Sequence, residues 1–219
     1  MIVLHYTAMD SAAAALERMC DPAPEVSAHY LIDRDGTIVQ MVDEDMRAWH
    51  AGAGAWGNVT DVNSHSIGIE LDYCPPFEGS LDFDARQMRA LSNLLTDILI
   101  RRPEITIDRI IGHSDMAPSR KFDPGPMFPW QELANQGLSI WPANVTDQMP
   151  NWDTFKSAAL KFGYRPPVDD HDGWNAVLFA FRTRFLTGQV GVLSARDMGV
   201  MVALGQSWPC RDGSVTTSQ

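Results

Sequence analysis

The sequence is poor in cysteine and has no long hydrophobic run. Its 219 residues include three cysteines, Cys20, Cys74 and Cys210, an odd number without the spacing of a cysteine zinc site. This argues against a disulfide-rich scaffold and predicts reduced thiols, as in cytosolic proteins. The longest apolar stretches, such as residues 91–100, are broken by polar side chains, whereas a membrane-spanning helix needs about 18 apolar residues. The sequence therefore predicts no membrane span.

Positive charge is also scarce, and the formal net charge is −11. Residues 1–141 hold 10 Lys and Arg against 21 Asp and Glu, whereas residues 142–219 hold 7 against 7. Because an acidic surface repels phosphate backbones, we expect no nucleic-acid partner. No secretory leader is evident, since His5 and Asp10 interrupt the apolar residues at the start. We therefore expect a cytoplasmic protein, with a periplasmic location as the alternative if a leader has been removed.

Strand and helix patterns alternate over the first 141 residues. Strands are predicted at residues 2–7, 66–72 and 109–112, with a hairpin at residues 29–42. Helices are predicted at residues 11–20, 83–102 and 129–137, the first of them capped by Asp10. This order predicts an α/β fold with a mixed central β-sheet flanked by helices.

The last third of the chain has a different pattern, in which aromatic residues recur at helical spacing. Trp152, Phe155 and Phe162 form one such stripe, and these stripes predict a small three-helix domain with an aromatic core. We therefore predict a first domain at residues 1–141, a Pro-containing linker at 142–150, the helical domain at 151–208 and a tail at 209–219.

The segment GHSDMAPSRKFDPG, residues 112–125, places His113, Lys121 and Asp123 on one loop rich in Pro and Gly. Histidine and aspartate are metal-ligand types, and His5 is a candidate third ligand near the C-terminal end of the first predicted strand. A catalytic zinc ion typically has three protein ligands and an open position for water, whereas structural zinc sites close with four ligands. Three apparent ligands therefore favour a catalytic zinc over a structural one.

Glu70 lies on the polar face of the predicted strand at residues 66–72. Apolar residues at positions 67, 69 and 71 share one face, so Gly68 and Glu70 point to the other. Gly68 leaves room on that face for a ligand or another backbone. Taken alone, Glu70 suits a salt bridge as well as a catalytic role, and Lys121 alone suits a solvated cation.

Five motifs occur in order over residues 2–141: LHYT, SAHYLIDRDGTIVQMV, RAWHAG, NSHSIGIELD and GHSDMAPSRKFDPGP. Together they resemble the type 2 family of N-acetylmuramoyl-L-alanine amidases, zinc enzymes that cut the amide between the lactyl group of muramic acid and the first alanine of the stem peptide. The resemblance implies one zinc ion per chain, held by His5, His113 and Asp123, with Glu70 and Lys121 as the catalytic residues. Asp123, where phage enzymes and animal recognition proteins of this fold usually have cysteine, resembles the bacterial cell-wall-recycling branch. The C-terminal helices resemble three-helix peptidoglycan-binding domains.

The implied chemistry is hydrolysis of an amide. Zinc held by two neutral histidines and one carboxylate keeps a net positive charge, polarises a carbonyl and lowers the pKa of a bound water to about 7. Our hypothesis is that Glu70 moves a proton from this water to the leaving alanine nitrogen, while Lys121 stabilises the developing oxyanion.

Further residues are candidates for substrate contact. Trp49 and His50 belong to a stretch that resembles the family's active-site rim, where an indole covers the apolar face of a sugar. His29, at the start of the hairpin, either supports the ligands or simply packs. Arg47 and Arg120 are candidates to pair with carboxylates of the substrate, although isolated arginines are commonly only solvated.

We therefore expect an amidase that acts on muropeptides, with 1,6-anhydro-muropeptides from cell-wall recycling as the favoured substrate. One alternative is a periplasmic or envelope amidase on intact peptidoglycan, for which the C-terminal helices would be the anchor. The other is a non-catalytic peptidoglycan-recognition module, although such modules typically lose zinc ligands that this chain keeps.

Overall fold

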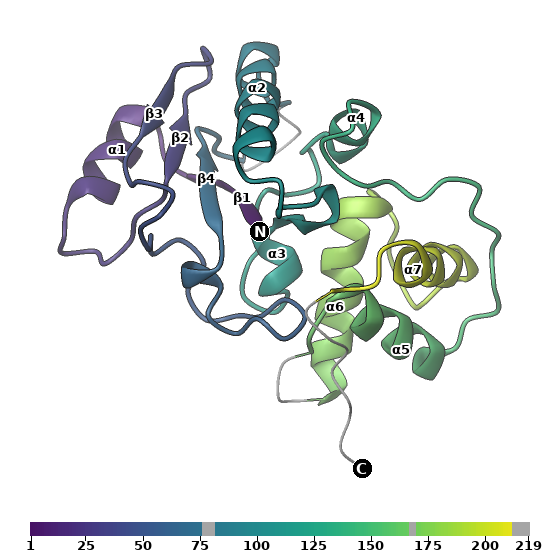
Figure 1. The fold of residues 1–219 in the computed structure, drawn as a ribbon. Coiled ribbons are helices and arrows are strands. Elements are labelled where there is room, and N and C mark those ends of the chain that lie inside the picture. Colours follow the sequence, from purple (N-terminus) through teal and green to yellow (C-terminus); the bar gives the residue numbers. More distant parts are fainter. Residues whose placement is uncertain (76–81, 167–169, 212–219) are drawn as a thin grey trace. The chain divides into compact units, whose positions relative to one another are not determined.

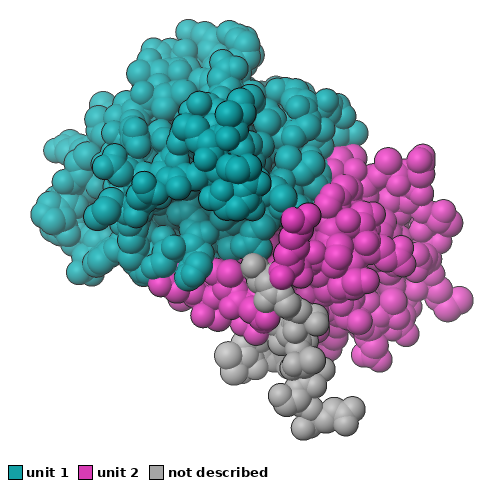
Figure 2. Space-filling model, in the orientation of Figure 1, with its two compact units in different colours: residues 1–52, 62–113, 127–140 teal, residues 53–61, 114–126, 141–219 magenta. Residues whose placement is uncertain are grey.

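The computed structural model describes residues 1–75, 82–166 and 170–211, which fold into two compact units (Figure 2). Unit 1 contains Met1–Gly52, Val62–His113 and Met127–Ile140. Unit 2 contains Ala53–Asp61, Ser114–Pro126 and the described residues from Trp141 onward. Two short segments of the first 141 residues therefore fold with the C-terminal helices. The domain boundaries at residues 141 and 150 stay a prediction, and residues 212–219 of the predicted tail lie outside the described residues.

Unit 1 is built on a five-stranded sheet of order β3-β2-β4-β1-β5 (Figure 1). Its strands are β1 Ile2–Tyr6, β2 Tyr30–Ile32, β3 Ile38–Gln40, β4 Ile67–Leu71 and β5 Ile110–Gly112. β1 runs parallel to β4 and β5, and β2 runs parallel to β4 but antiparallel to β3. The sheet is therefore mixed, which confirms the predicted α/β fold and the hairpin at residues 29–42.

The helices of unit 1 follow the predicted stripes with one correction at a cap. Helix α1, Ala12–Cys20, is capped by Ser11, whose side chain accepts a hydrogen bond from the Ala14 amide at 3.2 Å. The prediction that Asp10 caps this helix is wrong, because the helix begins one residue later and the serine hydroxyl satisfies its free amide. The shorter helix α4, Trp130–Asn135, lies in the predicted range.

Helix α2, Ala85–Arg101, is tied to the sheet by one buried polar residue. Leu91, Leu95 and Ile98 on its buried face are fully enclosed. Gln87, which is also fully buried, donates hydrogen bonds to the carbonyl groups of Ile32 and Asp72 at 2.9 and 3.1 Å. One acceptor belongs to the last residue of β2 and the other to the residue that follows β4, so the two bonds hold the C-terminal ends of both strands in place.

In unit 2 the described C-terminal residues form three helices, α5 Trp152–Phe162, α6 Asp170–Phe185 and α7 Ala195–Ser207. This agrees with the predicted three-helix pattern. Phe155, Phe162 and Phe181 are buried among them. Trp152 is 36% exposed, so its assignment to the aromatic core is wrong: it is the first residue of α5, where a side chain has fewer neighbours.

The segment at residues 53–61 packs into this aromatic core of unit 2. The Trp56 ring makes edge contacts with the rings of Phe162 and Tyr164, at centroid distances of 5.3 and 5.1 Å. Gly163, at φ +139°, lies close to the Trp56 indole: a Cβ at this position would be 2.5 Å from the nearest ring atom. No helix in the described part of the chain is long and apolar enough to cross a membrane.

Candidate metal centre

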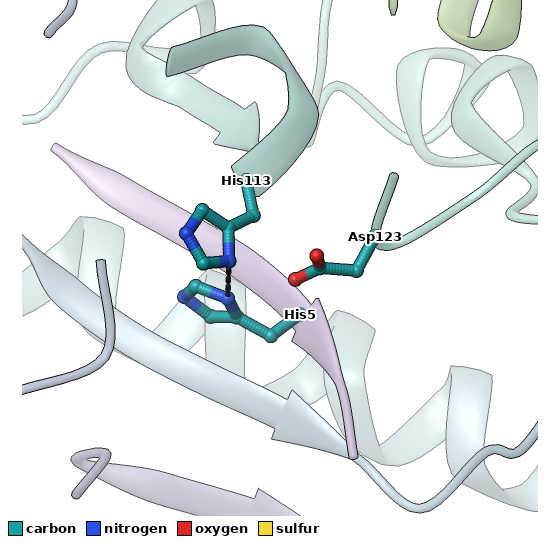
Figure 3. A group of neighbouring side chains, drawn as sticks. All are labelled: His5, His113 and Asp123. Carbon is teal, nitrogen blue, oxygen red and sulfur yellow. Dashed lines mark hydrogen bonds between the residues drawn. The ribbon is translucent and has the colours of Figure 1, made fainter. Parts of the chain in front are cut away.

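His5, His113 and Asp123 form a compact group of potential metal ligands (Figure 3). One ligand atom from each side chain lies within 4.8 Å of the other two. The two histidines and the aspartate are 1%, 2% and 7% exposed, and the Nδ1 atoms of His5 and His113 are 2.8 Å apart. The structure therefore brings together the three ligands that the sequence predicts, although they are far apart along the chain.

The hydrogen bond on the far side of His113 determines which of its nitrogens carries the proton. Its Nε2 lies 2.8 Å from the carbonyl oxygen of Ala51. A carbonyl oxygen only accepts, so Nε2 carries the proton and donates it. In the neutral ring Nδ1 then presents a lone pair to the centre, which is the form that binds a metal.

For His5, a longer chain of hydrogen bonds determines which ring nitrogen carries the proton. The Ser66 hydroxyl donates to the Val62 carbonyl at 2.5 Å, and with its one proton used it accepts from His50 Nε2 at 3.3 Å. His50 Nδ1 therefore accepts from His5 Nε2, at 2.9 Å. His5 is left with a lone pair on Nδ1, and this lone pair faces that of His113.

The donor set fits a cation, and zinc in particular. Two lone pairs only 2.8 Å apart, beside a carboxylate, repel one another unless a proton or a metal ion is bound to them. Two imidazole nitrogens and one carboxylate are ligands that zinc takes, and a three-ligand site keeps an open position for water. His5, His113 and Asp123 are therefore suited to hold a catalytic zinc ion.

Glu70 lies next to His5 on the sheet. It is the Cα partner of His5 in the parallel pairing of β4 with β1, so the two side chains leave the same face of the sheet from strands about 4.8 Å apart. Lys121 is half-buried and stands two residues before Asp123. Both predicted catalytic residues are thus neighbours of a candidate metal ligand, one across the sheet and one along the chain.

His50 and Gly68 fit together behind His5. A Cβ at position 68 would lie 2.3 Å from His50 Cγ, so only glycine leaves room for the imidazole. Burial, with the neighbouring imidazoles of His5 and His29, holds the pKa of His50 well below 6.5. His50 is therefore a neutral ring that hydrogen-bonds to the candidate ligand His5, and its predicted contact with substrate stays a prediction.

Both ring nitrogens of His29 are used by the backbone. Nδ1 accepts from the Gly68 amide at 2.9 Å, and Nε2 donates to the Met46 carbonyl at 3.0 Å. Burial lowers the pKa of His29, although the bond to Met46 opposes this. Of the two predicted alternatives, the arrangement favours packing that supports the strand beneath His50.

The remaining predicted substrate residues lie in different places. The Trp49 side chain is 46% exposed. Arg47 hydrogen-bonds to Ser64 and lines a hollow with Met1 and Ile67. That hollow is at the N-terminal ends of β1 and β4, whereas His5 and Glu70 stand toward their C-terminal ends.

Arg120, in unit 2, donates from Nε and Nη2 to the Ala53 carbonyl at 3.2 and 2.5 Å. The Arg120 guanidinium thus links one segment of unit 2 to another.

The sequence analysis missed Ser66 and the Ala51 carbonyl, whose hydrogen bonds determine which ring nitrogens of His5 and His113 carry the protons. Backbone acceptors carry no side-chain signal, and a lone serine in NSHSIGIELD has no distinctive spacing.

Comparison with known proteins gives a consistent set of matches. The family model described as N-acetylmuramoyl-L-alanine amidase matches residues 1–126. The N-acetylmuramoyl-L-alanine amidase AmiD of Escherichia coli is 41% identical over 160 residues, 65% of this chain and 54% of that protein. The 1,6-anhydro-N-acetylmuramyl-L-alanine amidase AmpD of Haemophilus influenzae is 44% identical over 108 residues, 48% of this chain and 55% of that protein. The chain thus spans about half the length of these curated relatives.

Two solved structures resemble this one over almost its whole length. AmiD from E. coli, in complex with the substrate anhydro-N-acetylmuramic acid-L-Ala-D-gamma-Glu-L-Lys, superposes with a TM-score of 0.86 at 32% identity, covering 95% of this chain and 89% of that one. AmpDh3 from Pseudomonas aeruginosa, in complex with anhydromuramic pentapeptide, superposes with a TM-score of 0.87 at 32% identity, covering 96% and 92%.

Proposed function

This chain belongs to the type 2 N-acetylmuramoyl-L-alanine amidase family, and we propose that it is a zinc-dependent amidase that cuts the bond between the muramoyl lactyl group and L-alanine. The observation that carries the proposal is the convergence of two imidazole lone pairs and a carboxylate within 4.8 Å. Hydrogen bonds to Ala51 and His50 hold both imidazoles in the metal-binding form. Three ligands with an open position are typical of a catalytic zinc site, which favours hydrolysis over recognition alone.

His5, His113 and Asp123 would hold the zinc ion. When bound, zinc would act as a Lewis acid that polarises a carbonyl group and lowers the pKa of water. The buried position of the three ligands limits the access of bulk water, which strengthens the electrostatic interactions of the site.

Glu70 and Lys121 would carry the proton and charge steps of the hydrolysis. The Glu70 carboxylate accepts a proton from the attacking water, whose oxygen bonds to the carbonyl carbon. The same carboxyl group then delivers the proton to the alanine nitrogen as the carbon–nitrogen bond breaks. The Lys121 ammonium stabilises the negative charge on the former carbonyl oxygen.

We propose 1,6-anhydro-muropeptides as the substrates. Two solved relatives of nearly the same extent as this chain hold ligands of this kind, an anhydro-N-acetylmuramic acid tripeptide and an anhydromuramic pentapeptide. A role in cell-wall recycling follows from such a substrate.

A cytoplasmic location is a separate proposal. It is supported by the odd number of cysteines, which lack metal-type spacing. Cell fractionation with antibody detection of the protein tests it.

The test compares wild type with Glu70→Gln and with Glu132→Gln, a matched change at an exposed residue of α4. Each zinc-loaded protein is incubated with anhydro-muropeptide or with intact sacculi, and free stem peptide is measured by mass spectrometry. We expect wild type and Glu132→Gln to release peptide from anhydro-muropeptide, and Glu70→Gln to release none while keeping about one zinc per chain.

Three other results would contradict this scheme. Release from sacculi alone would favour an envelope amidase. Binding without hydrolysis by the zinc-loaded wild type would favour a recognition module. Loss of zinc in Glu70→Gln would make Glu70 a structural residue and not the proton carrier.

A further inference from the structure

The segment that carries Lys121 and Asp123 is held by the C-terminal helices of unit 2. This segment, residues 114–126, is hereafter the ligand segment, and it belongs to the same compact unit as α5, α6 and α7. Its first acidic residue, Asp115, is 1% exposed and is not part of the proposed metal centre. A buried carboxylate is costly unless it is paired, so its partners indicate what it does.

Two side chains of the C-terminal helical region hydrogen-bond to Asp115. Its Oδ2 accepts a hydrogen bond from Arg184 Nη1 at 2.7 Å, and its Oδ1 accepts from the Tyr164 hydroxyl at 2.6 Å. The Arg184 side chain, on α6, is 2% exposed, and Tyr164, just after α5, is fully buried. Burial beside this carboxylate raises the pKa of Tyr164 well above 10, so its hydroxyl stays a donor.

Within the ligand segment, a backbone hydrogen bond connects the neighbour of Asp115 to the proposed metal ligand Asp123. The amide of Ser114, the residue next to Asp115, donates to the backbone carbonyl of Asp123 at 2.9 Å. On the other side of Asp115, the Met116 carbonyl accepts from the Ala55 amide at 2.8 Å. The backbone of Asp123 is thus one hydrogen bond and one peptide unit away from the residue that Arg184 and Tyr164 hold.

We propose that Arg184 and Tyr164 are positioning residues for the metal ligand Asp123, acting through Asp115. The C-terminal helices then help to position a metal ligand, in addition to any role as an attached peptidoglycan-binding domain. This inference rests on the proposed function only in taking His5, His113 and Asp123 as metal ligands. A shift of Asp123 changes metal affinity because ligand geometry sets the strength of the site.

A second buried ion pair on the same helix provides a matched control. Arg182 donates from Nε and Nη2 to Asp197 at 2.9 and 2.5 Å, and it also donates to the carbonyls of Gly191 and Val192. Both side chains are buried, at 7% and 0% exposure. These partners all lie at the start of α7 or in the loop before it, so Arg182→Met perturbs the helices without removing any of the hydrogen bonds to Asp115 described above.

The experiment measures the zinc affinity of the full chain by competition with a chromogenic chelator, together with thermal unfolding of each variant. The variants are Arg184→Met, Tyr164→Phe, Arg184→Lys and the control Arg182→Met. We expect Arg184→Met to weaken zinc binding by roughly 10-fold or more, in the range found for residues that orient metal ligands. Arg182→Met should bind zinc as tightly as wild type even where it unfolds at a similarly lowered temperature.

Tyr164→Phe keeps the ring and removes only the hydroxyl, so it should fold and still weaken zinc binding, by less than Arg184→Met does. Arg184→Lys keeps a cationic donor and should recover part of the affinity. Equal zinc affinity in Tyr164→Phe, Arg184→Met and Arg182→Met would overturn the proposal. Because the readout is metal binding, a wild type that binds zinc but does not hydrolyse muropeptide would refute the proposed function alone; a wild type that binds no zinc would refute both.

Discussion

Replacing His50 with phenylalanine tests the hydrogen-bond chain that presents His5 to the metal. The substitution keeps an aromatic ring against Gly68 but removes Nδ1, the acceptor for His5 Nε2 at 2.9 Å. His5 then loses the partner that fixes both its proton and its ring orientation. Changes of this kind typically weaken metal binding by about 10- to 100-fold, which corresponds to about 1.4 to 2.7 kcal/mol at 25 °C.

The assay is a zinc competition titration near neutral pH, on protein whose thermal unfolding shows that it is folded. Two variants separate the hydrogen bond from the packing. His50→Asn replaces the lost acceptor with an amide oxygen that can accept the hydrogen bond, so this variant should bind zinc more tightly than His50→Phe. Ser66→Ala removes only the far end of the chain, at 3.3 Å from His50 Nε2, and should have a smaller effect. Wild-type affinity in His50→Phe would refute the reasoning, and so would equal losses in the phenylalanine and asparagine variants.

Three further changes test other parts of the structure. Gly68→Ala places a Cβ 2.3 Å from His50 Cγ, so the ring must move and zinc affinity should fall in the same titration; an unchanged affinity would contradict the close fit. Lys121→Ala should lower turnover by about 10²-fold with zinc content unchanged, as measured by steady-state hydrolysis and metal analysis, and near-normal turnover would exclude the oxyanion role. The Arg101 guanidinium holds the pKa of Glu44 at about 2, below its usual 4.5, so Glu44 contributes stability that is fully present above pH 4.5 and is lost as the pH falls toward 2. The stability difference between wild type and Glu44→Gln, from urea unfolding, should therefore shrink across this range, and a constant difference would show that the carboxylate is not ionised preferentially in the folded protein.

Local patterns were sufficient to predict most elements of the fold. The apolar run at residues 2–7 and the alternation at residues 66–72 became β1 and β4, and the hairpin at residues 29–42 became β2 and β3. Such patterns can be read because the side-chain period of a strand or helix is set by its own backbone. The errors were at element ends, where Ser11 and not Asp10 caps α1 and where Trp152 is exposed, since neighbours in space decide those positions.

What the sequence by itself determined was the set of elements, the family motifs and the three side chains proposed as metal ligands. Only the tertiary structure decided which nitrogen of each histidine faces the centre, because the deciding partners are the Ala51 carbonyl and a chain that ends at Ser66 and Val62. It also decided that the ligand segment folds with the C-terminal helices, through a pair of buried charges 69 positions apart, Asp115 and Arg184. Hydrogen bonds between residues so distant along the chain follow no period, and a backbone carbonyl is the same at every residue, so neither leaves a pattern in the order of the amino acids.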